Sequence, residues 1–495
     1  MPRVTAASVR AAVAALGVLV VGLVLRRLII GSVLGEFNAD EASSGLHSLG
    51  VIRDGRFPVV INGQAYTAVI DAYLFSPLVA FADGSAKILK WLYVCMWATA
   101  SAVTYFGARR LSDRRSAAVA AALVWLAPGA LLVLSTKAYM GYAIGLAVVS
   151  ATIWATAVVA DQTEATARHS ATVGLLAGLA FYIHPMFATV LAPVIAVAAV
   201  VHRRDWRRWW LPASLAAIAA NLPFLAWNAT NGWPSLESQG PPGSYSDRLS
   251  GFVTGLLPRA LGLRAFDGRW VFAKPLALVL YAAIVLAVVT GCVLLIRAHR
   301  RPSRWIVTAG LIGCLPLMAL LSQLIYVTDG RYAIIPLPLM AIAIGATATH
   351  GIKSWHPQRA MVALAGVVTL WVAITTLPFL DRQHAFDTEN PDAWQDRVIS
   401  RLDELGIDRI AGNYWLVLPI EYRSDRSIRA AIAGNPYVIR FPESQRIVNA
   451  TSPEQVAFVF PPGEQDPGWF YLSVDSYRRE DLAGVVLYVP FAAGE

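Results

Sequence analysis

Charge is scarce in this chain. Asp, Glu, Lys and Arg together make up 15% of its 495 residues, whereas an average soluble domain carries about 25%. Hydrophobic residues make up 56%, and the mean hydropathy is +0.53. This composition excludes a soluble globular enzyme and an intrinsically disordered protein. Cysteine is rare as well, and all three cysteines lie inside apolar windows, so no disulfide framework is indicated: Cys95, Cys292 and Cys314.

Apolar windows of about twenty residues recur along most of the chain, and each is long enough to cross a hydrocarbon core about 30 Å thick. The pattern predicts an all-α polytopic membrane protein embedded in the lipid bilayer. We expect about eleven transmembrane helices, near residues 10–34, 88–107, 116–135, 139–160, 171–183, 186–201, 209–228, 272–296, 304–326, 332–349 and 360–380.

The net charge of +9 is high enough to suggest nucleic-acid binding, but its distribution argues against that function. From residue 381 to the end there are 11 Lys and Arg against 18 Asp and Glu, a net charge of −7. The rest of the chain carries +16, mostly as short basic clusters between apolar windows. Such clusters are signals of membrane topology, so we expect no nucleic acid among the partners.

The basic clusters lie on one side of the membrane if the N-terminus is cytoplasmic. Because cytoplasmic loops are enriched in Lys and Arg, this topology is favoured, and an odd number of spans then places the C-terminus outside. No small-residue cleavage site precedes Glu36, so we expect the first span to be an uncleaved anchor. The bias toward Ala, Val and Arg indicates a high-GC bacterium and therefore a multi-pass protein of the plasma membrane. The clusters are 109–115, 203–208, 297–304 and 353–359.

Arg26 and Arg27 do not fit this topology, because they would lie near the outer end of the first span. Their side chains could snorkel to the outer headgroups. The alternative is contact with an anionic lipid head.

The chain changes character after residue 380. We expect a transmembrane domain over 1–380, with a first outer loop at 35–87, and a small extracytoplasmic α/β domain over 381–495. Pro and Gly separate the regular elements of this tail. They are a helix-like stretch at 392–405 and β-like runs at 409–411, 457–460 and 484–490.

Carboxylates gather in the predicted outer segments, which hold ten of the fourteen in residues 1–380. The first outer loop opens with Asp40 next to Glu41. Adjacent carboxylates beside a bilayer can form a base whose pKa is tuned by desolvation and mutual repulsion. The alternative is that Asp40 or Asn38 caps a helix while Glu41 interacts with the helix dipole.

The same loop carries a more specific pattern. D-E-A at 40–42 is followed by P-x-x-x-x-G-Q-x-Y at 58–66, and then by Asp71 before A-Y-L-x-x-P at 72–77. This order resembles the first outer loop of GT-C glycosyltransferases, in particular the branch with protein O-mannosyltransferases and the lipid A aminoarabinose transferase. Weaker matches extend the resemblance over roughly residues 10–380: G-L-L-A-G-L at 174–179, His184-Pro185, Asn221-Leu222-Pro223, Trp227-Asn228, and Gly330-Arg331-Tyr332 before Pro336 and Pro338.

The resemblance implies a transferase that passes a hexosyl or pentosyl group from a polyprenyl-phosphate donor to an extracytoplasmic acceptor. It implies that Asp40 acts as the base or orients the acceptor, with Glu41 as a supporting group. Asp71 matches a second acidic position that holds acceptor or sugar hydroxyls, and Gln64 and Tyr66 are expected substrate contacts. The chemistry agrees, because a carboxylate can deprotonate a hydroxyl that attacks an oxocarbenium-like centre.

The phosphate that leaves needs cations, and the candidates on the outer side are Lys137, Arg331, His184 and the Arg26-Arg27 pair. Lys137 lies in a short connector, where snorkelling is the alternative. Arg331, followed by Tyr332, matches the last outer motif of the family and could grip the phosphate; the alternative is a local pair with Asp329, which would contribute little. His184, at the end of a span, is equally consistent with a structural role and a substrate contact.

Zinc-site spacings such as His-x-x-Glu-His and Cys-x-x-Cys are absent from the sequence, so no metal ligands are predicted. A divalent cation between Asp40, Glu41 and Asp71 stays open, because metal use varies across GT-C enzymes. The alternative function is a lipid or sugar transporter or flippase, which should show two related halves of broken spans and ionisable groups near the midplane. A third is an inactive homologue whose tail binds glycans.

Overall fold

The chain forms two compact units, each described here by itself. The helical unit comprises Met1–Ile29, Tyr93–Thr136 and Tyr142–Asp387. The loop–tail unit comprises Ile30–Leu92, Lys137–Gly141 and Thr388–Glu495. The computed structural model describes residues 6–237, 243–298, 300–321, 330–352, 355–387, 390–434, 438–463, 476–482 and 484–491.

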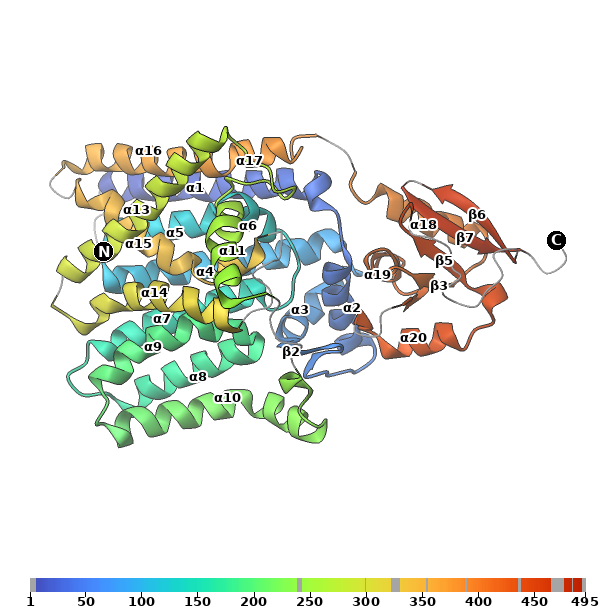
Figure 1. Ribbon diagram of the computed structural model, residues 1–495, viewed down its shortest axis with the longest axis horizontal. Helices are drawn as coiled ribbons and strands as arrows, with labels where there is room; N and C mark the ends of the chain where they lie inside the picture. The colour runs from blue at the N-terminus through green and yellow to red at the C-terminus, as the bar shows by residue number, and fades with distance from the viewer. Residues whose placement is uncertain are drawn as a thin grey trace. The chain divides into compact units, whose positions relative to one another are not determined.

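Long apolar helices that lie roughly parallel to one another form the helical unit (Figure 1). Within the described residues, six are long and apolar enough to cross a membrane. A helix lies at each of the eleven predicted positions, but Pro128 breaks the window at 116–135 into two shorter helices, so the number of spans stays a prediction. The helices are α1 (Ala6–Ile30), α4 (Ala86–Leu111), α5 (Arg114–Trp125), α6 (Gly129–Leu134), α7 (Tyr142–Ala160), α8 (Ala167–Ile183), α9 (Ala188–Val201), α10 (Leu211–Thr230), α11 (Tyr245–Gly251), α12 (Leu257–Ala260), α13 (Lys274–Ala298), α14 (Ile306–Leu321), α15 (Leu337–His350), α16 (Pro357–Thr375) and α17 (Leu377–Arg382).

Glycine sets the close packing of α8 on α10. A Cβ atom on Gly174 would collide with the backbone of Ala213, and one on Gly178 would collide with that of Ala217. Small residues four apart let membrane helices approach until their backbones touch. The G-L-L-A-G-L motif therefore serves helix packing.

The four basic connectors lie at one end of the helical unit. Arg110, at the end of α4, pairs with Asp161 after α7 at 3.1 Å, and Arg301, between α13 and α14, lies 4.0 Å from the same carboxylate. This arrangement agrees with the prediction that the clusters share one side of the membrane, while which side it is stays a prediction. Two further contacts join the remaining connectors: Arg208 with Glu164, and Arg115 with the carbonyl of Ile352.

Arg26 is buried within the helical unit. Its guanidinium donates hydrogen bonds to the carbonyls of Gly22 at 3.1 Å and Trp125 at 2.8 Å, and it lies 3.9 Å from the centre of the Trp125 ring. Snorkelling and lipid contact are therefore both wrong for Arg26, which joins α1 to α5 instead. Arg27 is exposed, and both interpretations stay open for it.

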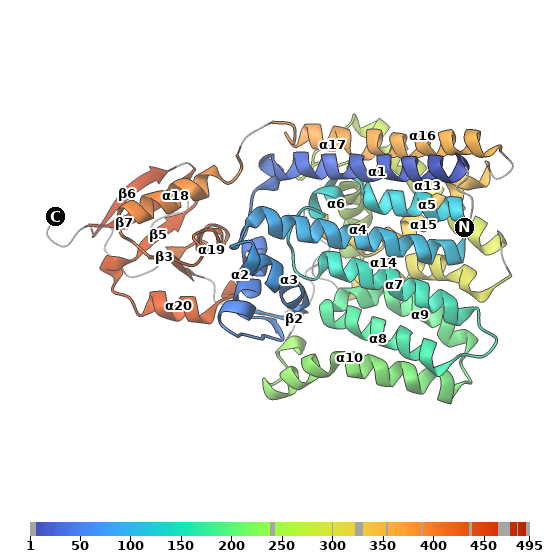
Figure 2. The ribbon, with the colours of Figure 1, turned by 180° about the vertical axis from the view of Figure 1, so that it is seen from behind.

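The loop–tail unit combines the first outer loop with a five-stranded sheet that α18, α19 and α20 flank (Figures 1 and 2). The strand order is β4-β3-β5-β7-β6, with β3 parallel to β4 and β5, and with β7 antiparallel to β5 and β6. The helix and the three β-runs predicted for the tail are confirmed as α18, β3, β5 and β7, while the domain boundary at 381 and the extracytoplasmic location stay predictions. The elements are α2 (Ala39–Arg53), β1 (Val60–Ile61), β2 (Gln64–Ala68), α3 (Ile70–Phe81), α18 (Ala393–Glu404), β3 (Arg409–Gly412), α19 (Tyr414–Arg423), β4 (Arg429–Ile432), α20 (Pro442–Asn449), β5 (Ala457–Phe460), β6 (Tyr477–Leu482) and β7 (Val485–Pro490).

Helix α2 packs on α19 of the tail. A Cβ atom on Gly45 would collide with the ring of Tyr422, which also stacks on Phe37 with ring centroids 5.1 Å apart. Ion pairs join the end of α2 and the residues after it to the tail: Arg53 with Asp425 at 2.5 Å, Asp54 with Arg426 at 2.8 Å, and Arg56 with Glu443. The first outer loop and the tail are thus one packed body.

The shared end of the basic connectors generates a topology prediction. A reporter that is active only outside the cytoplasm, fused after Glu495, should be active because the tail is expected outside. The matched fusion in the basic connector after Arg204 should be silent. The reverse pattern would contradict the predicted topology and move the carboxylates of the first loop to the cytoplasmic face.

Candidate active site

Asn38 starts α2 and fixes the carboxylates that follow. Its side chain accepts a hydrogen bond from the backbone N–H of Glu41 at 3.2 Å, and Glu41 Oε2 accepts one from the N–H of Asn38 at 3.3 Å. This reciprocal pair is a capping box, which satisfies two backbone donors at the helix start. Asn38 and not Asp40 is therefore the cap, so a loss of capping would not explain an effect of changing Asp40.

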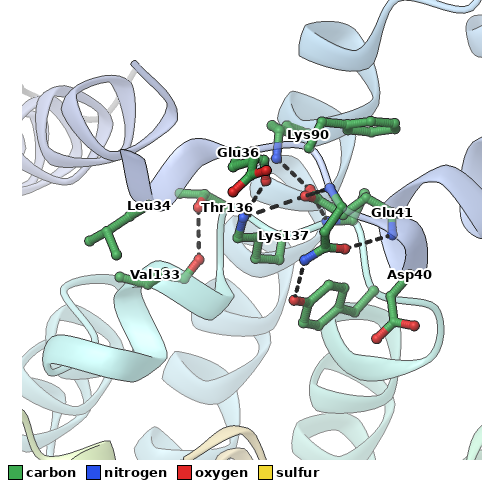
Figure 3. Close-up of polar contacts among 12 residues, drawn as sticks. Leu34, Glu36, Asp40, Glu41, Lys90, Val133, Thr136 and Lys137 are labelled. Carbon is green, nitrogen blue, oxygen red and sulfur yellow. Dashed lines mark hydrogen bonds and ion pairs between the residues drawn. The ribbon is translucent and has the colours of Figure 1, made fainter. Parts of the chain in front are cut away.

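The Glu41 carboxylate lies at the centre of a buried ion cluster (Figure 3). Lys90 Nζ donates to Oε1 at 2.6 Å and Lys137 Nζ approaches Oε2 at 3.5 Å, while the N–H of Ala138 donates to Oε1 at 3.0 Å. The side chains of Glu41 and Lys90 are 0% and 2% exposed. Burial alone would raise the pKa of Glu41, but the two ammonium charges and these hydrogen bonds outweigh it and hold the pKa below the ordinary value. Glu41 therefore carries a negative charge that the two lysines balance. A carboxylate held in this way is a poor base.

The segment 137–141 crosses between α2 and α3 and is held by side chains of both. Asn38 Nδ2 donates to the hydroxyl of Tyr139 at 2.7 Å, and Ser44 donates to the carbonyl of Ala138 at 2.6 Å. The backbone N–H of Gly141 donates to Asp71 Oδ2 at 3.0 Å. Asp71 is buried, and its carboxylate holds the backbone of Gly141 in place.

Lys137 has the Glu36 carbonyl as a second partner, 2.6 Å from its Nζ. Its side chain is 11% exposed. The ammonium group is paired with Glu41 and keeps some access to solvent, which is different from a lysine that snorkels alone.

Asp40 differs from its neighbour in environment. It is half-buried, and its carboxylate points away from the Glu41 cluster (Figure 3). The hydroxyl of Tyr414, on α19, donates to Asp40 Oδ1 at 2.9 Å. Of the two adjacent carboxylates, Asp40 is thus the one that solvent and ligands can reach.

Gln64 and Tyr66 lie on β2, in a short hairpin where the sequence motif predicted a loop. Asn62-Gly63 forms its turn, with a φ of 70° at Gly63. The hairpin contacts the tail through Asn62, which donates to the Ile439 carbonyl at 2.7 Å and accepts at its own carbonyl from Arg440 at 3.1 Å. Tyr66 is 39% exposed.

The helical unit gathers a second group of predicted residues. The rings of Tyr142, His184 and Tyr332 pack against one another, with each pair of ring centroids 6.0 to 6.4 Å apart. The guanidinium of Arg331 lies 5.9 Å from the centre of the Tyr332 ring. Asp329, the local partner considered for Arg331, lies outside the described residues.

His184 is the neutral member of this group. Burial, with a smaller effect of the Arg331 charge, lowers the pKa of His184 to about 4. Its Nδ1 accepts a hydrogen bond from the N–H of Met186 at 3.2 Å, which places the ring proton on Nε2. His184 thus caps a 3-10 turn and has Nε2–H as its donor, while Arg331 supplies the positive charge.

Two of the three carboxylates considered for a divalent cation already have other partners. Both oxygens of Glu41 already accept hydrogen bonds or ion pairs, and Asp71 Oδ2 holds the backbone of Gly141. Among the described residues there is no group of three or more His, Cys, Asp and Glu side chains that could hold a metal ion. A divalent cation between Asp40, Glu41 and Asp71 stays a prediction.

Sequence reasoning missed three residues of these groups: Lys90, Tyr142 and Tyr414. Lys90 had a signal, because an ionisable side chain inside a predicted span is expected to have a partner. Tyr142 and Tyr414 had none, since they reach their partners through the fold.

Solved structures with similar folds have been found. ArnT from Cupriavidus metallidurans bound to undecaprenyl phosphate has a TM-score of 0.65 and 12% identity, over 97% of this chain and 98% of that one. The oligosaccharyltransferase AglB from Archaeoglobus fulgidus, in complex with an inhibitory peptide and a dolichol-phosphate, has a TM-score of 0.52 and 13% identity, over 97% of this chain and 74% of that one. The predicted resemblance to the GT-C fold of lipid A aminoarabinose transferases is thereby confirmed.

Another AglB structure from the same archaeon, in complex with Zn and sulfate, has a TM-score of 0.50 and 13% identity, over 96% of this chain and 73% of that one. A scan against family models gives no match for this chain, and a search of curated sequences gives none either. The comparisons therefore bear on the fold.

The ion cluster generates a stability prediction. Lys90→Met should lower the free energy of unfolding by about 3–5 kcal/mol, because it leaves a buried carboxylate with too little compensating charge. Thermal unfolding in detergent measures the loss. Lys87→Met is the matched control, since Lys87 is exposed on the same helix and should change stability by no more than about 0.5 kcal/mol. Equal effects of the two substitutions would contradict a special role for Lys90.

Proposed function

We propose that this GT-C chain is a membrane glycosyltransferase that moves a sugar from a polyprenyl-phosphate carrier to a hydroxyl acceptor outside the cytoplasm. The observation that carries the proposal is the difference in environment between two neighbouring carboxylates. Glu41 is buried and neutralised by two lysines, while Asp40 is accessible and points away from them. A fold shared with a protein bound to undecaprenyl phosphate supports the choice of donor.

Asp40 is the general base in this proposal. It takes the proton of the acceptor hydroxyl while the acceptor oxygen bonds to the anomeric carbon of the sugar. The bond between that carbon and the carrier phosphate breaks, and the phosphate keeps the electron pair. Asp40 suits this role because it is only half-buried, whereas its neighbour Glu41 is fully buried and paired with two lysines.

Cations are needed for the phosphate that leaves. Lys137 is the candidate in the loop–tail unit, because Glu41 and the Glu36 carbonyl hold its ammonium group in place. The cluster contains two ammonium groups and one carboxylate, so it keeps a net positive charge that an anion can complement. Arg331 is the candidate in the helical unit, where the neutral His184 offers an N–H and the Tyr332 ring flanks the guanidinium.

Transfer by the purified chain tests the proposal, with radiolabelled polyprenyl-phosphate hexose and pentose as donors and candidate cell-envelope acceptors. Asp40→Asn should reduce transfer roughly 10²-fold or more, the usual loss with a general base. Folding should be unaffected, because Asn38 caps the helix. Asp83→Asn is the matched control, since Asp83 is exposed and lies at a positive φ that asparagine also adopts.

Two outcomes would contradict the proposal. Full transfer by Asp40→Asn would show that Asp40 is not the base. Movement of labelled lipid across reconstituted membranes, with no transfer to any acceptor, would favour the flippase alternative.

Donor binding tests Arg331. Arg331→Ala should weaken binding of a polyprenyl phosphate by about 2–5 kcal/mol if the phosphate is left buried without its partner. Arg331→Lys should restore part of the loss, because an ammonium group cannot form the bidentate contact of a guanidinium. Arg382→Ala, at an exposed arginine of α17, should bind the donor as the wild type does. Unchanged donor binding by Arg331→Ala would show that Arg331 does not bind the phosphate.

A further inference from the structure

The tail contributes a side chain to the proposed base. Tyr414 is the first residue of α19, and its hydroxyl donates to Asp40 Oδ1 at 2.9 Å. No motif in the sequence pointed to it. A hydrogen bond from a distant element to a carboxylate with a proposed chemical role raises the question of what that bond does.

The local structure holds Tyr414 in place from its own side. Asn413 caps α19 by accepting a hydrogen bond from the N–H of Trp415 at 2.9 Å, and its own N–H donates to the Val459 carbonyl on β5 at 3.0 Å. A Cβ atom on Gly412 would collide with the backbone of Val459. The step from β3 into α19 is therefore fixed against the neighbouring strand β5, and Tyr414 lies just beyond the carboxyl end of β3, between β4 and β5 in the sheet.

A cation lies behind the phenol ring. The guanidinium of Arg440 is 5.6 Å from the centre of the Tyr414 ring and hydrogen-bonds to the Tyr414 side chain. The same guanidinium donates to the Asn62 carbonyl at 3.1 Å, at the turn of the hairpin. A continuous chain of contacts therefore runs from the hairpin turn through Arg440 and Tyr414 to Asp40.

Toward Asp40 the Tyr414 hydroxyl is the donor, while it accepts the hydrogen bond of Arg440. Burial raises the pKa of Tyr414, and the negative charge of Asp40 raises it further. Both effects favour the neutral phenol, which keeps the proton that it donates. A neutral donor of this kind stabilises the charged form of a carboxylate and restricts its rotation.

We propose that Tyr414 is a positioning residue that holds the Asp40 carboxylate in the orientation in which it accepts the proton of the acceptor hydroxyl. This inference rests on the proposed function, since the orientation of Asp40 matters to transfer only if Asp40 is the base. It gives the tail a part in catalysis. The rate enhancement by a general base depends strongly on its position, because a misplacement of about 1 Å can cost about 10²-fold in rate.

Tyr414→Phe removes only the hydroxyl and keeps the ring that packs against Arg440. Transfer should lose roughly tenfold in kcat, a part of the cost of a misplaced base, while KM for the donor and binding of polyprenyl phosphate stay unchanged. Unchanged donor binding also shows that the variant is folded.

Tyr422→Phe is the matched control on the same helix. Its ring stacks on Phe37 as part of the same interface, and its buried hydroxyl has no hydrogen-bond partner among the described residues. This variant should keep the wild-type kcat. A loss equal to that of Tyr414→Phe would mean that the interface matters and the bond to Asp40 does not, which would overturn the inference.

A double-mutant cycle shows whether Tyr414 acts through Asp40. In the Asp40→Asn background, Tyr414→Phe should cause no further loss of the residual transfer, because the group that it positions has gone. A further tenfold loss in that background would overturn the inference. Failure of this inference is distinguishable from failure of the proposed function. A fully active Asp40→Asn would show that Asp40 is not the base. An inactive Asp40→Asn together with a fully active Tyr414→Phe would rule out only the positioning role of Tyr414.

Discussion

The loop–tail unit depends on one buried carboxylate. Glu41 accepts from two lysines and two backbone N–H groups, and these four donors come from the start of α2, the first turns of α4 and the segment 137–141. A buried ion pair contributes little net stability, but the loss of one partner is costly. The cluster therefore acts mainly as a geometric constraint that fixes three pieces of chain at one point. Asp40 is the next residue, so its position follows from that constraint.

The same constraint explains how two adjacent carboxylates can differ. On sequence alone, Asp40 and Glu41 form a pair whose mutual repulsion could tune either one. In the structure the charge of Glu41 is balanced within its own cluster and the carboxylate of Asp40 points away from it (Figure 3). In the helical unit, Arg331 stays charged while His184 stays neutral. The charge state of each group therefore follows from residue type, burial and the charges beside it.

Much of the fold could be predicted from local sequence, because hydropathy and strand alternation are local signals. The apolar windows correspond to helices, and the tail elements at 409–411, 457–460 and 484–490 are strands. Other features had local signals that were not used: Pro128 ends a helix, and Asn62-Gly63 is typical of a two-residue hairpin turn. Of the site, Asp40 and Lys137 could be predicted from the motif and from an unusual charge in a short connector. Tyr414 could not, because only the folding of the tail against α2 brings it to Asp40, and no local pattern encodes that pairing.

The loop–tail unit is built from the beginning, the middle and the end of the chain. Helix α2 is synthesised early, but the aromatic ring against which Gly45 packs and the tyrosine that contacts Asp40 belong to the last part to be made. During synthesis α2 therefore lacks its packing partner α19 until the tail has been made. A chain that terminates early would hold a complete set of apolar helices and still have an unfinished α2. Biogenesis thereby couples completion of the polypeptide to completion of this helix, so that shortened products of translation would lack the environment of Asp40 even when they reach the membrane.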